Sequence, residues 1–522
     1  MLTRSLMIIA LAASLLSSCG SDDALSSDSR GSETPNQSGT GVGQSGAQDF
    51  GRFRGIIESG ELPSPDTLDV VGFFNEHKIE LPAPTCEGPV CLHGALGVQG
   101  NMINGSNCTV ILAGMNTALD PADYERPPLN LAIVVDVSGS MQGNAIESVR
   151  LGLEDFAGEL DPKDNVTLIT YSNQSAVLFE STTTDIDRVG FIDAVRTIRA
   201  GGGTNIYAGL REGLEAVLGA KDENRQNRLI LLSDGLATEG ITDDARIINL
   251  GKTYAEQGIG ITTIGVGQDF DIHLMRSLSN TGAGNFYFLE DPGAVREVFI
   301  EEASSFVVPL ANDVRIGLDV TGPYAVRGAY GSRIWDAQDN SAEVLIPSLF
   351  MASRQSVDDI TPDGGRRGGG GGILFELVPI PVQELLDATP ANHKAGTLTL
   401  EYTLPGSEQK VTQTVDVMNT LKPGETPEDG AFESPSVEKA FVTLNIYVGM
   451  KLAIERAAVG SPGAALGVIE PLITQLEIWL TTHEDADIKA DLELLKKLKI
   501  VIDKRSGPRE TIGTAVNPWP YD

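Results

Sequence analysis

The sequence predicts an α/β fold in which a doubly wound, mostly parallel sheet forms the centre of the chain. Between Leu131 and about Phe306, short apolar runs alternate with segments whose apolar residues recur at helical spacing. Strands that alternate with helices in this way form parallel sheets covered on both faces. Polar residues directly follow two of the apolar runs, at the carboxyl ends of strands where such sheets bind ligands. Smaller regions are expected on either side: an N-terminal α+β region and a C-terminal β domain with a helical hairpin.

Length and charge limit the classes of protein that the chain can represent. At 522 residues it is long enough for two or three domains, and a hydrophobic content of 41% is sufficient for packed cores. The formal net charge of −34 argues against nucleic acid as a partner, because phosphate binding requires clustered lysine and arginine. An acidic surface instead favours solubility and attracts cations.

Residues 1–18 have the features of a lipoprotein signal peptide. Met1–Arg4 supply a positive start, and Ser5–Leu16 form an apolar stretch that is too short to span a membrane comfortably. The Leu-Ser-Ser-Cys sequence that ends at Cys19 resembles the lipobox of bacterial lipoproteins, which implies cleavage before Cys19 and lipidation of this cysteine. An ordinary signal peptide with a chance cysteine is the alternative. Gly20 stands where enterobacterial lipoproteins retained in the inner membrane have aspartate, so the resemblance implies lipid anchoring in the bacterial cell envelope, at the outer membrane.

Two regions are expected between the signal peptide and the central sheet. Residues 19–49 consist mainly of Ser, Gly, Asp, Gln and Thr, which predicts a disordered tether. About thirty such residues have a reach of ~30 Å. Residues 50–128 are predicted as the N-terminal α+β region. Within it, Phe53–Glu58 and Thr67–His77 have apolar residues at helical spacing, and Leu92–Met115 alternates apolar and polar residues as strands do.

Three cysteines remain if Cys19 is lipidated, and all of them precede the central sheet. An envelope location permits disulfides. Cys86 and Cys91 could close a small loop, but Cys108 is an equally good partner for either of them, so one of the three stays unpaired. A zinc site is not expected, since only His93 lies nearby.

Residues 129–308 supply the strands and helices of the predicted parallel sheet. The expected strands are Leu131–Val135, Val166–Tyr171, Ala176–Phe179, Leu229–Leu232, Ile261–Val266 and Phe286–Leu289. The expected helices are Ala145–Leu160, Ile186–Ile198, Ile206–Leu218, Ala245–Gln257, Ile272–Ser279 and Ala294–Ser305. In the first of these helices, Ile146, Val149 and Leu153 recur on one face, as expected for a helix packed against a sheet.

The pattern changes after Pro309, where short strands separated by Gly and Pro turns predict a β-rich domain over residues 309–420. The expected strands are Asp313–Val320, Ala342–Leu349, Leu374–Val378, Gly396–Leu404 and Lys410–Val417. The glycine-rich stretch Gly364–Ile373 lacks the GK[ST] ending and the following helix of a phosphate-binding loop, so a hairpin loop is expected. Residues 434–505 are predicted as a helical hairpin or small bundle on the preceding sheet, formed by Ser436–Ala457, Leu466–Thr482 and Ala486–Asp503.

Three side chains that carry oxygen follow the first apolar strand at alternate positions. Asp136, Ser138 and Ser140 lie in a loop of small residues, and alternate residues of an extended loop can converge on one point. One carboxylate and two hydroxyls suit a hard cation such as Mg²⁺, Mn²⁺ or Ca²⁺ better than zinc or copper. Alternatively, the two serines are turn residues and Asp136 caps the helix that begins near Gly143.

Two further loops extend this set of oxygen ligands. Thr204 lies in a glycine-rich turn between two predicted helices, and Asp234 directly follows an apolar strand. This DxSxS…T…D set, in this order and in this strand–helix context, resembles the metal-ion-dependent adhesion site of von Willebrand factor type A domains, a Rossmann-like fold. The resemblance implies that Ser138, Ser140 and Thr204 coordinate the cation directly or nearly so. It also implies that Asp136 and Asp234 often act through water.

The charge of this set has a consequence for binding. Two carboxylates balance a divalent ion, and three hydroxyls add coordination without further charge. One position is left for water or for an Asp or Glu side chain of a partner. Mg²⁺ suits this octahedral, partly hydrated arrangement better than Ca²⁺. Asn205 and Ser233 are candidates for holding the ligands, since they adjoin them in sequence.

The expected function is metal-dependent protein binding or adhesion through an acidic partner residue. A metal-dependent hydrolase and a structural scaffold subunit of an envelope complex are the alternatives. Hydrolysis is disfavoured because the three loops contain no histidine, cysteine or lysine to act as base or nucleophile. The segments GELPSPDTLDVVGFFNEH and RPPLNLAIVVDVSGSM resemble those of YfbK-like bacterial lipoproteins. The type A resemblance covers about 180 residues and implies that affinity changes when the last helix, Ala294–Ser305, shifts.

Overall fold

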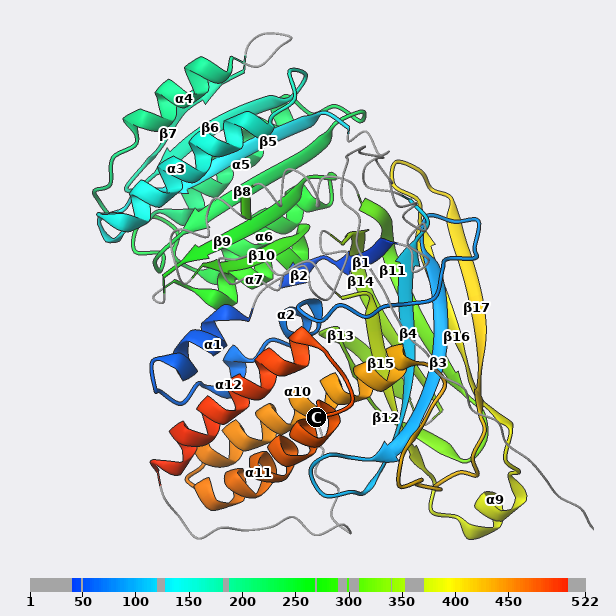
Figure 1. Ribbon diagram of the computed structural model, residues 1–522. Coiled ribbons are helices and arrows are strands. Elements are labelled where there is room, and N and C mark those ends of the chain that lie inside the picture. Colours follow the sequence, from blue (N-terminus) through cyan, green and yellow to red (C-terminus); the bar gives the residue numbers. More distant parts are fainter. Residues whose placement is uncertain are drawn as a thin grey trace, which may run out of the picture. The chain divides into compact units, whose positions relative to one another are not determined.

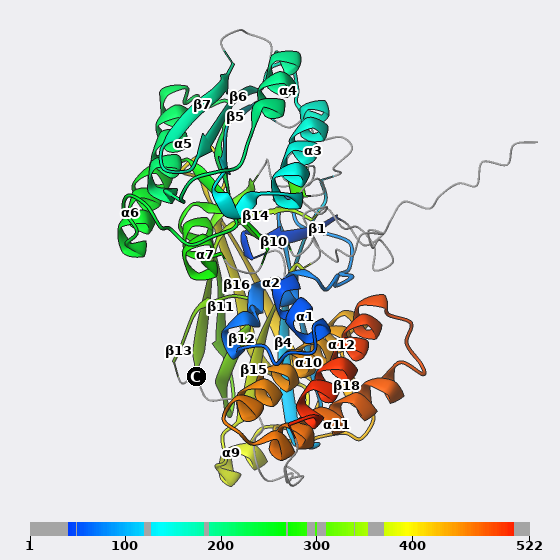
Figure 2. The ribbon, with the colours of Figure 1, turned by 90° about the vertical axis from the view of Figure 1, so that its left-hand side faces the viewer.

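The computed structural model describes residues 40–47, 50–119, 127–181, 187–267, 270–289, 298–299, 309–338, 340–352 and 370–505, all within the compact unit Ser38–Asp522. The described strands form one sheet of seven strands and one of eleven (Figures 1 and 2). Four predicted features lie wholly or mostly outside the described residues: the signal peptide with Cys19, the tether up to residue 39, the helix Ala294–Ser305 and the glycine-rich stretch Gly364–Ile373.

The seven-stranded sheet confirms the predicted doubly wound, mostly parallel α/β fold. Its strands run in the order β2-β10-β9-β8-β5-β6-β7, and each neighbouring pair is parallel except β6 and β7. Strand β5 is buried along its whole length, which explains its unbroken apolar run. The bounds are β2 (Gly46–Ala47), β5 (Leu129–Asp136), β6 (Asn165–Tyr171), β7 (Ser175–Glu180), β8 (Gln226–Ser233), β9 (Gly260–Val266) and β10 (Ala283–Leu289).

Helices cover both faces of this sheet (Figure 1). One face packs against α3 (Asn144–Glu159) and α4 (Arg188–Thr197), which follow the short 3₁₀ helix η2 (Gly139–Met141). The other face packs against α5 (Ile206–Gly219), α6 (Asp244–Ala255) and α7 (Ile272–Thr281). The apolar side chains that predicted these helices are the ones buried against the sheet, as expected for amphipathic helices.

The eleven-stranded sheet is antiparallel throughout and contains strands from both flanking regions. Its main path is β12-β15-β4-β1-β14-β11-β16-β17, while β13 pairs with β14, and β3 pairs with β4 and β18. The prediction that residues 50–128 and 309–420 form separate regions was therefore wrong, because β4 and β15 are hydrogen-bonded neighbours. The bounds are β1 (Thr40–Gln44), β3 (Cys91–Gly100), β4 (Asn107–Thr117), β11 (Pro309–Val320), β12 (Tyr324–Tyr330), β13 (Ile334–Gln338), β14 (Ser341–Met351), β15 (Gly372–Pro379), β16 (His393–Thr403), β17 (Lys410–Asn419) and β18 (Ala431–Phe432).

Residues 40–47, at the end of the predicted tether, form strands in both sheets. Strand β1 lies between β4 and β14, and β2 pairs with β10 at the edge of the seven-stranded sheet. The prediction of disorder was wrong for these residues. Their composition is poor in apolar side chains, but backbone N–H and C=O groups pair with neighbouring strands whatever side chains they carry. Val42, the single large apolar residue of the segment, is fully buried.

Five helices share a second hydrophobic core. The three long C-terminal helices are α10 (Pro435–Ala458), α11 (Pro462–Trp479) and α12 (Ala486–Asp503), which agree with the prediction. They pack with α1 (Gly51–Glu58) and α2 (Val70–Asn75), so the N-terminal helices join the C-terminal bundle. Helix α10 also packs against β3, β4 and β15. The remaining described helices are η1 (Pro65–Thr67) and α9 (Gln383–Ala388).

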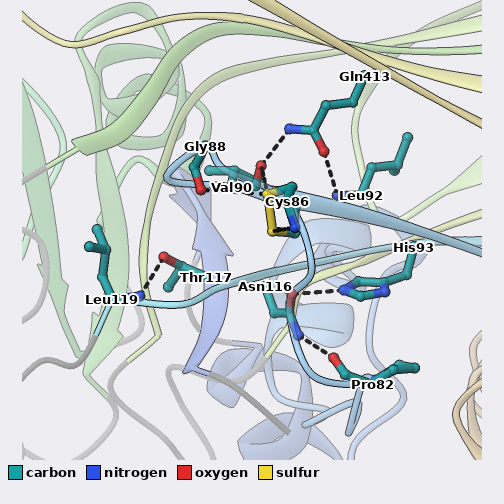
Figure 3. The surroundings of a disulfide bond; sticks show 11 residues. Pro82, Cys86, Gly88, Val90, Leu92, His93, Asn116, Thr117, Leu119 and Gln413 are labelled. Carbon is teal, nitrogen blue, oxygen red and sulfur yellow. Dashed lines mark hydrogen bonds between the residues drawn. A yellow bond between two sulfur atoms is a disulfide. The ribbon is translucent and has the colours of Figure 1, made fainter.

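One disulfide joins Cys86 to Cys91, which decides between the pairings that the sequence left open (Figure 3). Cys108, the third cysteine, is a buried free thiol in β4. The Gln413 side chain of β17 lies beside the disulfide, where it donates to the carbonyl of Val90 at 2.6 Å and accepts from the N–H of Leu92 at 3.2 Å. These two hydrogen bonds connect the start of β3 to β17, an edge strand of the eleven-stranded sheet.

Candidate metal centre

The predicted metal ligands lie at the carboxyl ends of β5 and β8. Strand β5 ends at Asp136, and Asp234 directly follows β8. Because these strands are parallel neighbours, both carboxylates leave the sheet at the same edge. The glycine-rich turn before α5 reaches this edge as well, since the N–H of Gly139 donates to the carbonyl of Gly202 at 3.0 Å.

Two serine hydroxyls converge on one carboxylate oxygen. The Ser140 Oγ donates to Asp234 Oδ1 at 2.8 Å, and the Ser138 Oγ lies 3.5 Å from the same oxygen. The two hydroxyl oxygens are themselves 2.9 Å apart. Ser138 is buried and Ser140 is exposed, so the set opens to solvent on the side of Ser140. The alternate spacing in the loop therefore brings these side chains together, as the sequence predicts.

Asp136 is fully buried and is held from three directions. Its Oδ1 accepts from the backbone N–H of Ser138 at 2.8 Å. Its Oδ2 accepts from the hydroxyls of Ser233 at 2.9 Å and Tyr171 at 3.3 Å. The hydroxyl of Tyr171, at the end of β6, also lies 3.0 Å from the carbonyl oxygen of Leu232. The bond from Ser233 agrees with the orienting role that the sequence suggested.

Thr204 lies in the turn before α5. A Cβ atom placed on Gly235 would lie 3.8 Å from both Thr204 Oγ1 and Ser140 Oγ, so both hydroxyls lie close to Gly235. The N–H of Thr204 donates to Thr238 Oγ1 at 3.0 Å, and its carbonyl accepts from the N–H of Thr238 at 2.9 Å. Asn205 accepts from the N–H of Ala208 and thereby caps α5, so its side chain positions the helix.

The comparison with known families agrees with this geometry. Residues 130–301 match the family model of the von Willebrand factor type A domain. The chain contains a von Willebrand factor type A (VWA) domain. VWA domains commonly bind a divalent metal at a metal-ion-dependent adhesion site (MIDAS) and mediate protein interactions. The match covers the seven-stranded sheet from β5 onward and includes all five predicted metal ligands.

Known proteins resemble parts of the chain. The protein sll0103 of Synechocystis is 26% identical over 178 residues, which cover 34% of this chain and 41% of the relative. YfbK of Escherichia coli is 26% identical over 204 residues, 39% of this chain and 35% of the relative, which confirms the predicted resemblance. The matches thus span less than half of either relative. A VWA structure from Catenulispora acidiphila covers 80% of this chain and 96% of its own, at 13% identity and a TM-score of 0.46.

The charge environment of the VWA site fits a cation. Burial raises the pKa of the Asp136 carboxyl, although the hydrogen bonds from Ser138, Ser233 and Tyr171 lower it. Burial also raises the pKa of Asp234 to about 6, and the negative charge of Asp136 adds to this shift. In the described part of the chain, no lysine or arginine offsets either carboxylate. Two such carboxylates beside three hydroxyls form an oxygen set suited to a hard divalent ion.

The described residues contain no group of three or more His, Cys, Asp or Glu side chains that could hold a metal. The donor set predicted from the sequence accordingly consists of hydroxyls together with two carboxylates. Sequence reasoning proposed five ligands, of which the structure brings Ser138, Ser140 and Asp234 into contact. It missed Tyr171, because a tyrosine at the end of an apolar strand is most often a core residue and carries no signal of its own.

Proposed function

We propose that the VWA domain binds Mg²⁺ through Ser138, Ser140 and Thr204, with Asp136 and Asp234 balancing its charge, and that it captures a protein partner through an Asp or Glu side chain. The observation that carries this proposal is the convergence of the two serine hydroxyls on Asp234, with the Thr204 hydroxyl near the adjacent Gly235. In this proposal the direct protein ligands are neutral hydroxyls, so a coordination position remains that a partner carboxylate can fill. Mg²⁺ is favoured over Ca²⁺ because Mg²⁺ keeps several water ligands, and Mn²⁺ is the alternative ion.

The proposed role is binding and not catalysis. Hydrolysis needs a group that can take a proton from water or attack the substrate. All five histidines lie outside the three ligand loops, at positions 77, 93, 273, 393 and 483. The cysteines and lysines of the chain lie outside these loops as well. The proposed site can therefore polarise a bound oxygen, but its three ligand loops contain no histidine, cysteine or lysine to act as a base.

A pull-down from envelope extracts tests the binding function. Wild-type protein with Mg²⁺ is expected to retain a partner that is lost in EDTA and lost again with Asp234→Ala. Asp193→Ala, which removes an exposed carboxylate on α4, is the matched control and should retain the partner. A partner that binds equally with and without EDTA would contradict metal-dependent capture, and a phosphate-ester hydrolysis lost with Asp234→Ala would favour the hydrolase.

Anchoring in the bacterial cell envelope, at the outer membrane, is proposed from the lipobox-like sequence that ends at Cys19. No helix in the described part of the chain is long and apolar enough to cross a membrane. Expressed in a bacterium that processes lipoproteins, wild-type protein should fractionate with membranes, and Cys19→Ser should appear in the soluble fraction. If Cys19→Ser stays with the membranes, lipid anchoring at this cysteine is wrong.

A further inference from the structure

A carboxylate lies at the edge of the proposed metal site without taking part in it. The backbone N–H of Glu239 donates to the carbonyl of Thr204 at 3.2 Å. A Cβ atom on Gly203 would lie 2.6 Å from the Cγ of Glu239 and 3.3 Å from its Oε1, so this side chain lies directly on the turn that carries Thr204. Glu239 is exposed, and no described lysine or arginine forms an ion pair with it.

The other exposed side chains around the site are apolar or neutral. Leu236, which follows Asp234 by two positions, is 56% exposed. Asn173 is exposed and accepts from the N–H of Gly203 through its Oδ1. We call Asn173, Leu236 and Glu239 the rim. The loops that surround the site, residues 137–142, 172–174, 201–205 and 235–242, contain no lysine or arginine.

We propose that the rim selects partners in which the metal-binding carboxylate has an apolar and a basic residue as its neighbours. This inference rests on the proposed function. A partner carboxylate must approach from the exposed side of the site, where Ser140 lies. Leu236 follows Asp234 by two positions and Glu239 lies on the turn that carries Thr204, so residues next to the carboxylate pass close to them. A basic neighbour then pairs with Glu239, whereas an acidic neighbour is repelled by it. Leu236 covers an apolar neighbour and loses exposure to water.

Two short peptides test the selection. One carries a single Asp between Leu and Lys, and the other carries a single Asp between Leu and Gln; both have blocked ends and a fluorescent label. Their binding to the full chain in Mg²⁺ is followed by fluorescence anisotropy. Because exposed charge pairs contribute modestly, the peptide with Lys is expected to bind about fivefold more tightly. This ratio should shrink as salt is added.

Variants distinguish attraction by Glu239 from attraction by the net negative charge of the chain, which also favours a basic peptide. Glu239→Gln should lower the ratio, and Glu239→Lys should lower it further. Glu256→Gln removes an equally exposed charge at the end of α6, far along the helix from the metal edge, and should leave the ratio unchanged. Leu236→Ala should weaken both peptides about equally, without changing the ratio.

The outcomes distinguish this inference from the proposed function. If neither peptide binds in a manner that requires Mg²⁺, the proposed function fails. If both bind with Mg²⁺ but the ratio is one in wild type, or is the same in Glu239→Gln and Glu256→Gln, the selection by Glu239 is overturned. If Leu236→Ala binds both peptides as wild type does, the apolar part of the inference is overturned.

Discussion

Asp136→Asn is expected to abolish the stabilisation of the protein by Mg²⁺ and to leave the metal-free protein at least as stable as wild type. Burial raises the pKa of Asp136, so an ionised carboxylate at this position is costly when no cation is bound. Asparagine removes this charge at nearly constant volume. In wild type, Mg²⁺ at a hundredfold excess over its Kd should add about 2.7 kcal/mol to the free energy of unfolding, and in the variant it should add almost nothing.

The neighbours of Asp136 can adapt to asparagine. The N–H of Ser138 still finds an amide oxygen. The hydroxyls that now donate to Oδ2 have other acceptors, because Ser233 lies 3.3 Å from the carbonyl of Gly235 and Tyr171 lies 3.0 Å from that of Leu232. A large loss of stability without metal would therefore contradict this account of the site.

The stabilisation by Mg²⁺ should also depend on pH, because the protonation state of Asp234 changes with pH. In the metal-free fold its pKa is raised to about 6 from an ordinary value of 3.8. Between these two values the unfolded chain has lost its proton and the folded chain has kept it. The metal-free protein should thus lose stability from this group as pH rises from about 4 to about 6. Mg²⁺ needs the ionised carboxylate, so its affinity should fall as pH drops through about 6.

Thermal unfolding with and without Mg²⁺, at several pH values, measures these effects. Asp193→Asn is the matched control, since it removes an exposed carboxylate from α4 of the same domain. It should keep both the metal-induced shift and its pH dependence. An unchanged shift in Asp136→Asn would remove Asp136 from the proposed site.

The position of the candidate ligands in the fold was predictable where they have a local signal. A buried parallel strand has an unbroken run of apolar residues in the sequence. The polar residues that follow it lie at the carboxyl edge of the sheet. Asp136 and Asp234 both follow such strands, so their proximity follows from topology. Thr204 has a weaker signal, a hydroxyl in a glycine-rich turn, and its assignment depended on the family pattern. Tyr171 has no such signal, because its role depends on the hydroxyl contact across β5 and β6.

The flanking fold was less predictable because its partners are distant in sequence. An alternating pattern shows that β4 and β15 are strands, but nothing local states that they pair with each other. Residues 40–47 show the limit most clearly. Their composition is typical of a flexible segment. They form strands because their backbone pairs with β4, β14 and β10, which the local sequence does not indicate.

The part of the molecule where the sheets and N-terminal helices meet leads to the second prediction: Asp69→Ala should destabilise the protein by about 3 kcal/mol. Asp69 is fully buried, and its Oδ2 contacts Arg276 of α7 at 3.5 Å and also Arg333 between β12 and β13. Arg276 is nearly buried as well and lies over the Phe286 ring, 5.5 Å from its centroid. Without Asp69, two arginines of like charge remain together, one of them shielded from water.

Asp69 also caps α2 by accepting from the N–H of Gly72 at 2.7 Å, so loss of the cap must be separated from loss of the ion pairs. Asp187→Ala provides this control. Asp187 caps α4 by the same bond, to Gly190 at 2.9 Å, but is exposed, and its loss should cost about 1 kcal/mol. Chemical denaturation of both variants gives the comparison.

Equal losses in the two variants would show that Asp69 acts only as a cap. If the buried charge is the cause, Asp69→Ala combined with Arg276→Met should recover part of the loss, because it removes the arginine that would otherwise stay buried without its partner. Arg276 belongs to the VWA domain, while Asp69 and Arg333 belong to the flanking regions. Recovery in the double variant would therefore identify this ion-pair cluster as an attachment between the VWA domain and the remainder of the compact unit.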